Sequence, residues 1–172
     1  GEYLNGKKHG KGKKYDKYGK LKFEGEYLNG KKWNGTLYNI INLENHKLTN
    51  GNGYLKKYYE NGILMLENEL LNGLKNGKRK EYYDNGTLRF EGEYLYGHII
   101  KGKKYYNDGK LEYEGEFLFD KKFNGKGYDK NGNIMYELNN GNGKVKEFSK
   151  LTGKLIFEGQ YLNGKKSGKG KE

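Results

Sequence analysis

Residues 82–95 read YYDNGTLRFEGEYL, and this stretch decides the fold of the chain. Residues 84–86 (DNG) suit a three-residue hairpin turn in which the glycine supplies a positive φ. After this turn every second residue is apolar or glycine, which is the period of a strand with one buried face. The residues on that face are Leu88, Phe90, Gly92 and Tyr94. The stretch therefore predicts a β-hairpin with one aromatic side.

The same pattern returns along the whole chain. Residues 1–8 (GEYLNGKK) recur unchanged at residues 25–32, and related segments begin at Gly92, Gly115 and Gly159. Such fixed spacing is typical of repeat proteins, whose units pack on their neighbours. We predict one repeat array over residues 1–172, with units starting near residues 1, 25, 49, 68, 92, 115, 139 and 159. Units match again at an offset of 90 or 91 residues, which predicts two four-unit blocks, residues 1–91 and 92–172.

The repeats predict an all-β fold with very little helix. We expect an elongated, single-sheet antiparallel meander, or solenoid, of about eight stacked β-hairpin repeats. Two units, beginning near residues 49 and 139, are shorter than the others. Trp33 and Phe123 precede these short units, and we expect their rings to fill the space that a missing strand leaves, with stacking on a ligand as the alternative.

The second face of each hairpin is expected to carry a ladder of opposite charges. Facing pairs of this kind stabilise neighbouring strands by ~0.2–1 kcal/mol each. Counting outward from the turns, we expect these pairs to be Arg79 with Glu91, Glu81 with Arg89, and Lys104 with Glu112. On the aromatic side, a glycine such as Gly92 leaves a gap between two rings. We expect a ring of the neighbouring hairpin to lie over that bare backbone.

The composition points to anionic partners. The chain has 34 Lys and Arg residues against 22 Asp and Glu, a formal net charge of +12. A basic surface favours nucleic acid, acidic lipid or anionic glycan, although the same excess also keeps a repeat protein soluble. Lysine pairs follow the turn of several units and are candidate contacts for an anion or a partner, with solvated hairpin loops as the alternative. These residues are Lys7, Lys8, Lys31, Lys32, Lys121, Lys122, Lys165 and Lys166.

No residue pattern predicts catalysis. The absence of cysteine excludes disulfides and thiolate metal sites, and the three histidines fall in three different units. Carboxylate pairs such as Glu24 and Glu26 recur from unit to unit, whereas a catalytic pair should be singular. Residues 97–104 resemble a phosphate-binding loop, but Lys104 stands where that loop needs Ser or Thr. We therefore predict a non-enzymatic chain without catalytic, cofactor-binding or metal-binding residues.

The repeat resembles the MORN repeat, in the bacterial variant found in proteins labelled as YwqK-family antitoxins. Unit four carries the first part of the motif, from Tyr82 to Tyr94, and unit one carries the Asn-Gly-Lys-Lys-x-Gly end, residues 5–10. The resemblance covers essentially the whole chain through repetition. The chain departs from the eukaryotic form because it has a single Trp and two truncated units. Choline- or glucan-binding hairpin repeats are an alternative, less consistent with one Trp in eight units.

The resemblance implies a scaffold that mediates protein–protein interaction or attachment. The alternatives are charge-driven binding of acidic lipid, glycan or nucleic acid, and antitoxin-like binding of a toxin protein. No run reaches the ~18 apolar residues of a membrane-spanning helix. We also expect the chain to be part of a longer array, because residue 1 falls inside a strand pattern and residue 172 comes before the Tyr that should close the last hairpin. Open array ends would then allow self-association.

Overall fold

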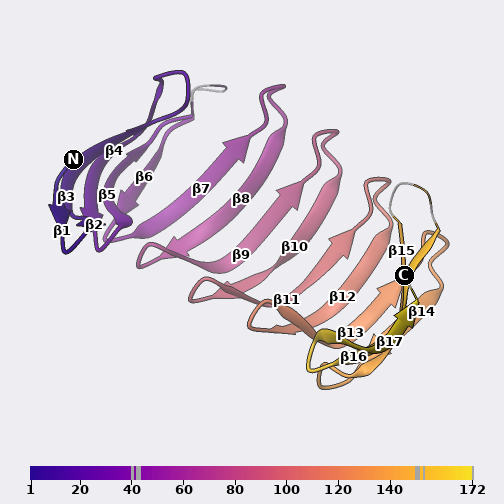
Figure 1. The fold of residues 1–172 in the computed structure, drawn as a ribbon. Coiled ribbons are helices and arrows are strands. Elements are labelled where there is room, and N and C mark those ends of the chain that lie inside the picture. Colours follow the sequence, from indigo (N-terminus) through magenta and orange to yellow (C-terminus); the bar gives the residue numbers. More distant parts are fainter. Residues whose placement is uncertain (40, 42–43, 150–151, 153, 172) are drawn as a thin grey trace. The chain divides into compact units, whose positions relative to one another are not determined.

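The structure is a computed structural model of all 172 residues, and it describes residues 1–39, 41, 44–149, 152 and 154–171. Figure 1 shows strands that follow one another in chain order. The first nine are β1 (Tyr3–Leu4), β2 (Lys7–Lys8), β3 (Gly10–Tyr15), β4 (Leu21–Leu28), β5 (Lys31–Leu37), β6 (His46–Thr49), β7 (Asn52–Tyr58), β8 (Leu64–Leu71) and β9 (Leu74–Tyr82). The others are β10 (Leu88–Leu95), β11 (His98–Tyr105), β12 (Leu111–Leu118), β13 (Lys121–Tyr128), β14 (Ile134–Leu138), β15 (Gly143–Phe148), β16 (Leu155–Leu162) and β17 (Lys165–Lys171).

The sheet topology is a meander. Strands β3 to β14 form a twelve-stranded sheet in sequence order, while β1 with β2, and β15 to β17, form two smaller sheets. Neighbouring strands such as β3 and β4, β4 and β5, and β7 and β8 pair antiparallel, and the described residues contain no helix. The predicted all-β meander of hairpins is confirmed. The eight unit starts and the two four-unit blocks stay predictions.

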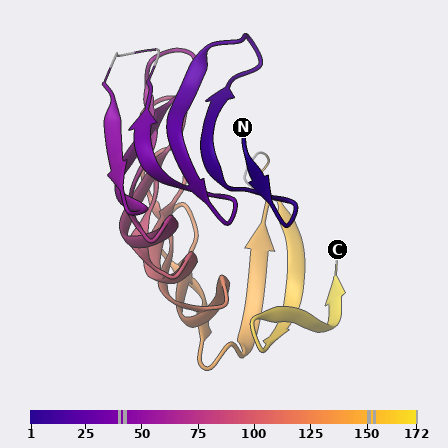
Figure 2. The same ribbon diagram turned by 90° about the vertical axis from the view of Figure 1, so that its left-hand side faces the viewer.

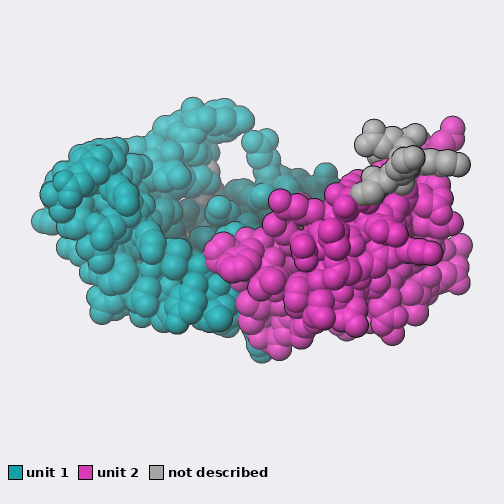
Figure 3. Space-filling model, turned by 60° about the horizontal axis from the view of Figure 1, so that its bottom comes forward, with its two compact units in different colours: residues 1–86, 94–97 teal, residues 87–93, 98–172 magenta. Residues whose placement is uncertain are grey.

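The chain forms two compact units. Unit 1 comprises residues 1–86 and 94–97, and unit 2 comprises residues 87–93 and 98–172 (Figure 3). Each unit has its own buried residues. Those of unit 1 include Phe23, Tyr27, Leu37 and Leu48, which form one cluster with Leu55 and Leu70 packed against it. Those of unit 2 include Phe90, Tyr113, Phe117, Leu138, Val145 and Phe157. Within each unit, we call the side of the strands that carries these residues the aromatic face, and the opposite side the ladder face.

Asn-Gly turns hold successive hairpins together at one edge of the sheet. Asn29 and Gly30 have φ values of 49° and 84°, which match the two-residue turn that the right-handed twist of a hairpin favours. The backbone N–H of Gly30 donates to the carbonyl of Lys8 at 2.8 Å, and the N–H of Gly73 donates to that of Gly51 at 2.8 Å. The turn glycines thus have two roles: their positive φ closes each hairpin, and their N–H groups donate hydrogen bonds to the neighbouring hairpin.

A bulge between Lys104 and Tyr105, just before a hairpin turn, changes the register that the sequence predicted. Lys103 pairs with Glu114 and Lys104 pairs with Tyr113, after which Tyr105 pairs with Leu111. The predicted facing of Lys104 and Glu112 is therefore wrong. A bulge inserts one extra residue into a strand, so the side chains before it move to the other face. The same shift occurs in unit 1, where bending of the strands is visible in Figure 2.

Arg79 lies on the aromatic face, not on the ladder face where the sequence placed it. It pairs with Asn68 across the strands, and Glu81 pairs with Leu66. The Arg79 guanidinium donates to Asn68 Oδ1 at 2.9 Å and to Glu81 Oε1 at 2.6 Å, and Arg79 is only 9% exposed. The prediction that Arg79 and Glu81 belong to the charge ladder is therefore wrong, for the same reason of register.

Glycine pairs on adjacent strands make room for an aromatic ring. A Cβ atom added at Gly92 would overlap the carbonyl oxygen of Lys101 and lie 2.5 Å from Phe90 Cζ. The predicted close approach is confirmed, but the ring comes from the same strand and not from the neighbouring hairpin. In the hairpin of β8 and β9, Leu66 stands where other hairpins have the aromatic ring. Asn68 and Arg79 stand there in place of the two paired glycines. Glycines therefore occupy these positions where an aromatic ring covers the backbone.

The single tryptophan has a packing role. A Cβ atom added at Gly51, in the turn of the short hairpin of β6 and β7, would lie 2.8 Å from Trp33 Cζ3. The backbone N–H of Gly51 also donates to the Trp33 carbonyl at 2.7 Å. The indole therefore covers the short turn, as the sequence predicted for the ring that precedes a truncated unit.

Candidate anion-binding site

The ladder face largely neutralises itself. Lys13 Nζ lies 2.9 Å from Glu24 Oε1, and further pairs at 3.0–3.8 Å join Lys101 to Glu93, Lys103 to Glu114, Lys126 to Glu137 and Lys146 to Glu158. Tyrosine hydroxyls also donate to carboxylates of this kind, as Tyr128 does to Glu114 and Tyr105 does to Glu91, both at 2.7 Å. Partial burial and this hydrogen bond raise the pKa of Tyr105 to about 12. These lysines and glutamates are therefore engaged within the sheet.

The predicted lysine pairs divide between solvent and the aromatic rings. The first lysine of each pair is exposed: Lys7, Lys31, Lys121 and Lys165. The second extends over a ring, with Nζ 4.4–5.4 Å from the ring centroid, in the contacts of Lys8 with Tyr27, Lys32 with Phe23, Lys122 with Tyr113 and Lys166 with Phe157. Successive side chains of a strand point to opposite faces, so the pairs do not form one continuous ridge. Their role in binding stays a proposal.

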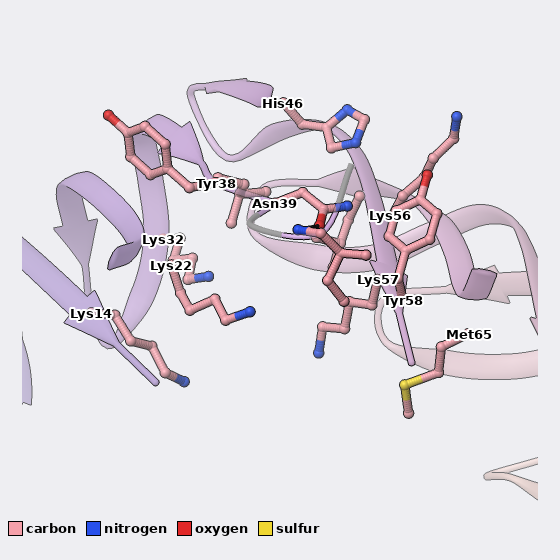
Figure 4. Close-up of a pocket in the computed structure, with 13 residues that line it drawn as sticks. Lys14, Lys22, Lys32, Tyr38, Asn39, His46, Lys56, Lys57, Tyr58 and Met65 are labelled. Carbon is pink, nitrogen blue, oxygen red and sulfur yellow. Dashed lines mark hydrogen bonds between the residues drawn. The ribbon is translucent and has the colours of Figure 1, made fainter. Parts of the chain in front are cut away.

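Unit 1 contains a pocket of about 300 Å³ that is rich in lysine. Five lysines line it: Lys14 of β3, Lys22 of β4, Lys32 of β5, and Lys56 and Lys57 of β7. Leu37, Leu55 and Met65 supply apolar wall, and Tyr38, Asn39, Ile41, His46 and Tyr58 complete the lining. Figure 4 shows Lys22, Lys32 and Lys57 extending into the same hollow. No carboxylate occurs among the described residues that line it.

Register explains why these cations gather. Lys14 pairs with Phe23, Lys32 with Tyr27, and Lys57 with Leu66. Residues directly opposite each other in a sheet point to the same side, so the three lysines share the aromatic face. The bulges beside Tyr15 and Tyr58 bring Lys14 and Lys57 to this side.

The lysines of the pocket differ in their partners. Lys22 lies 3.9 Å from Asp16, and Lys56 lies 3.2 Å from Glu44. No ion pair with a described carboxylate engages Lys14, Lys32 or Lys57 within 4.0 Å. Lys32 is half-buried; its burial, with repulsion from Lys14, Lys57 and Lys8, lowers its pKa to about 8. Partial burial and the neighbouring cations, Lys14 first, also lower the pKa of Lys57.

Two further polar groups of the pocket lack hydrogen-bond partners. Asn39 Nδ2 and His46 Nε2 are both buried and unpaired. A buried donor without a partner costs roughly 1–3 kcal/mol, so such groups need an explanation. Both residues line the hollow into which the lysines extend. The pocket therefore offers uncompensated positive charge together with unused hydrogen-bonding capacity.

Comparison with known proteins places the repeats in a family. Residues 52–72, 75–96 and 100–118 match the family model described as the MORN repeat variant. Three consecutive copies of the hairpin described above are thus recognised as this repeat. The central part of the chain consists of MORN repeats. The match is to the repeat type, and the narrower YwqK-family label stays a prediction. No curated protein matches the chain.

MORN repeats are a non-catalytic repeat type that generally mediates protein or membrane-lipid interactions. Among the described residues, no group of three or more His, Cys, Asp or Glu side chains could hold a metal ion. No helix in the described part of the chain is long and apolar enough to cross a membrane.

Of Lys14, Lys32 and Lys57, the three pocket lysines that have no ion pair with a described carboxylate, the sequence predicted only one as a contact residue. Lys32 belongs to a predicted lysine pair, but Lys14 and Lys57 were not singled out. A usable signal exists, since both directly precede the tyrosine next to a hairpin turn. That position faces the rings once the bulge is included in the register.

Proposed function

We propose that the chain is a non-enzymatic repeat scaffold that binds a protein partner with exposed acidic groups. The aromatic face of unit 1, with Lys14, Lys32 and Lys57, is the binding surface. Antitoxin-like binding of a toxin protein would be one form of this function. Self-association through array ends stays a separate proposal.

The observation that carries this proposal is the contrast between the two faces. Ladder lysines such as Lys13 have a glutamate within 2.9–3.8 Å. Lys14, Lys32 and Lys57 have no ion pair with a described carboxylate, and the pKa of Lys32 is lowered by burial first and then by repulsion from Lys14, Lys57 and Lys8. Bringing like charges together costs free energy that an acidic group would recover. Charge complementarity also raises the rate of association with acidic partners.

The geometry favours a protein over a bilayer or a nucleic acid. Lys32 is half-buried, so its ammonium is best reached by a group that projects into the hollow, which a flat membrane surface does not supply. Binding of single-stranded nucleic acid usually relies on open aromatic rings for base stacking. Here Phe23 is fully buried and Lys32 lies over its ring. Acidic side chains on a protein surface can project into the hollow, and they need no open aromatic ring for binding.

The test is affinity capture from native extract with matched variants. Lys57→Glu reverses a charge in the pocket, and Lys47→Glu makes the same change at an exposed position of β6 outside it. We expect a protein that the native chain and Lys47→Glu retain and that Lys57→Glu loses. Capture that nuclease treatment abolishes, or that acidic vesicles compete away, would favour the alternative partners. Equal capture by both variants would refute the proposed surface.

A further inference from the structure

We infer that the lysine pocket of unit 1 is a binding site for a phosphate monoester, a tetrahedral dianion attached to a small organic group. This inference rests on the proposed function for its choice of face. It deepens that function by naming the chemistry that the pocket recognises.

The cations surround one space from three strands. Lys14 comes from β3, Lys32 from β5 and Lys57 from β7, and each ammonium has three hydrogen-bond donors and no acceptor. These groups cannot satisfy one another, so an anion whose oxygens face several donors at once is the acceptor that suits the pocket. A phosphate monoester brings three outer oxygens and a charge close to −2 at neutral pH. A carboxylate has two oxygens and one charge, and it leaves more of the repulsion in place.

The lining also accommodates the organic group of the ester. A volume of about 300 Å³ lies at the lower end of ~300–1,000 Å³ for small-molecule sites, and it exceeds what a bare phosphate fills. Leu37, Leu55 and Met65 form apolar wall in the same pocket. Asn39 Nδ2 is a buried donor with no partner and adds a neutral hydrogen bond to an oxygen. The lining thus combines a cationic part with an apolar part.

The second four-hairpin block contains the same positions with a different charge pattern. At an offset of 90 residues, Lys14 and Lys32 correspond to Lys104 and Lys122. Lys22 and Lys57, however, correspond to Glu112 and Glu147. Two cations are thus replaced by two acids, so the positions of the five pocket lysines carry three lysines and two glutamates in the second block. The backbone register is retained, since Glu147 pairs with Phe157 as Lys57 pairs with Leu66.

In unit 2, Lys122 forms a hydrogen bond within the unit. His46 corresponds to Tyr136, whose hydroxyl accepts a hydrogen bond from Lys122 Nζ at 2.5 Å. The Tyr136 ring stacks on Tyr113 with centroids 6.4 Å apart, and Lys122 lies over both rings. The corresponding positions of unit 2 therefore combine fewer cations with a lysine that is hydrogen-bonded within the unit. We assign the phosphate site to unit 1 alone.

The experiment is isothermal titration calorimetry of the intact chain with phenyl phosphate, and with benzoate as the matched carboxylate. We expect one saturable site for phenyl phosphate and binding of benzoate weaker by about tenfold or more. Lys32→Met keeps the stem over Phe23 and removes the charge, and Lys57→Glu introduces the residue that unit 2 carries. Each should weaken phenyl phosphate about tenfold or more, since a charge-assisted hydrogen bond is lost. Lys47→Glu should leave the affinity within about twofold.

Vesicles of phosphatidylcholine containing phosphatidic acid distinguish the source of the phosphate. Vesicle binding that Lys57→Glu abolishes would support the phosphate chemistry with a lipid as its source. Phenyl phosphate binding without vesicle binding would support a soluble ester or a phosphorylated side chain. No saturable binding to either probe would overturn the inference. An equal loss in Lys47→Glu would also overturn it, because the effect would then be net charge alone.

Failure of this inference and failure of the proposed function can be told apart. If an acidic protein is captured through Lys57 but phenyl phosphate does not bind, the scaffold function stands and the phosphate site is wrong. If phenyl phosphate binds through Lys32 and Lys57 but capture is identical in both charge variants, the site stands and the partner surface is wrong. Circular dichroism of each variant verifies that the β fold is retained.

Discussion

Replacing Gly92 by alanine should destabilise unit 2 far more than replacing its neighbour Glu93. The added Cβ would overlap the Lys101 carbonyl oxygen and lie 2.5 Å from Phe90 Cζ and 3.0 Å from Gly102 Cα. Two of these three contacts are backbone atoms, which cannot rotate away as a side chain can. The φ of Gly92 lies outside the positive region, so the effect is steric. Overpacking of a core costs ~1–3 kcal/mol, and backbone contacts place this variant at about 3 kcal/mol.

The control variant, Glu93→Ala, removes a side chain on the ladder face. Glu93 lies 3.1 Å from Lys101 Nζ, and both side chains are about half exposed. An exposed ion pair of this kind contributes ~0–1 kcal/mol. Urea denaturation followed by circular dichroism measures the difference. With a slope of ~1–3 kcal/mol per molar urea, the Gly92→Ala midpoint should fall by about 1 M or more below that of Glu93→Ala. Coincident midpoints would show that the ring over Gly92 does not require a bare backbone.

Three further predictions concern other parts of the chain. Arg79→Met should destabilise unit 1 by about 3 kcal/mol, because it removes the nearly buried guanidinium that donates to Asn68 and Glu81. Thermal unfolding measures this change, and a loss of stability below about 1 kcal/mol would contradict the prediction. Tyr96→Asn should raise the melting temperature, since Tyr96 is 68% exposed with a φ of 50° that asparagine adopts with less strain, and an unchanged or lower melting temperature would count against this. The pKa of Lys32 is lowered from 10.5 to about 8, so the unfolded chain binds more protons between these values and stability should rise with pH across that window. Urea midpoints at about pH 7.5 and 9.5 should show a rise that Lys32→Met lacks, and parallel profiles would refute the assignment.

Much of the hairpin architecture could be predicted from local sequence. Alternation over residues 88–95 identifies a strand with one apolar face, and Asn29-Gly30 identifies a turn that only a few residue types adopt readily. Both signals depend on neighbours in the chain, which is why they can be read without a structure. The repetition of the signals then led to the meander and to the MORN repeat, which the family match supports over residues 52–118.

The candidate site could be predicted only in part. Lys32 was found because it belongs to a lysine pair that recurs with the repeat. Lys14 and Lys57 were missed, and Arg79 was assigned to the wrong face, because the period of two was carried through the bulges. A bulge adds a single residue to one strand, and its position depends on pairing with the partner strand.

The sequence by itself determined the fold class, the turns, the alternation of the two faces and the excess of positive charge. The tertiary structure decided which lysines meet. Lys14, Lys32 and Lys57 are separated by 18 and 25 positions in the chain, and they share a pocket only because register places each on the aromatic face. It also decided which charges stay uncompensated, since Lys13 and Lys14 are neighbours in sequence and only Lys13 faces a glutamate. The physical reason is that strand pairing is non-local, and a shift of one residue exchanges the ion-paired face for the open one.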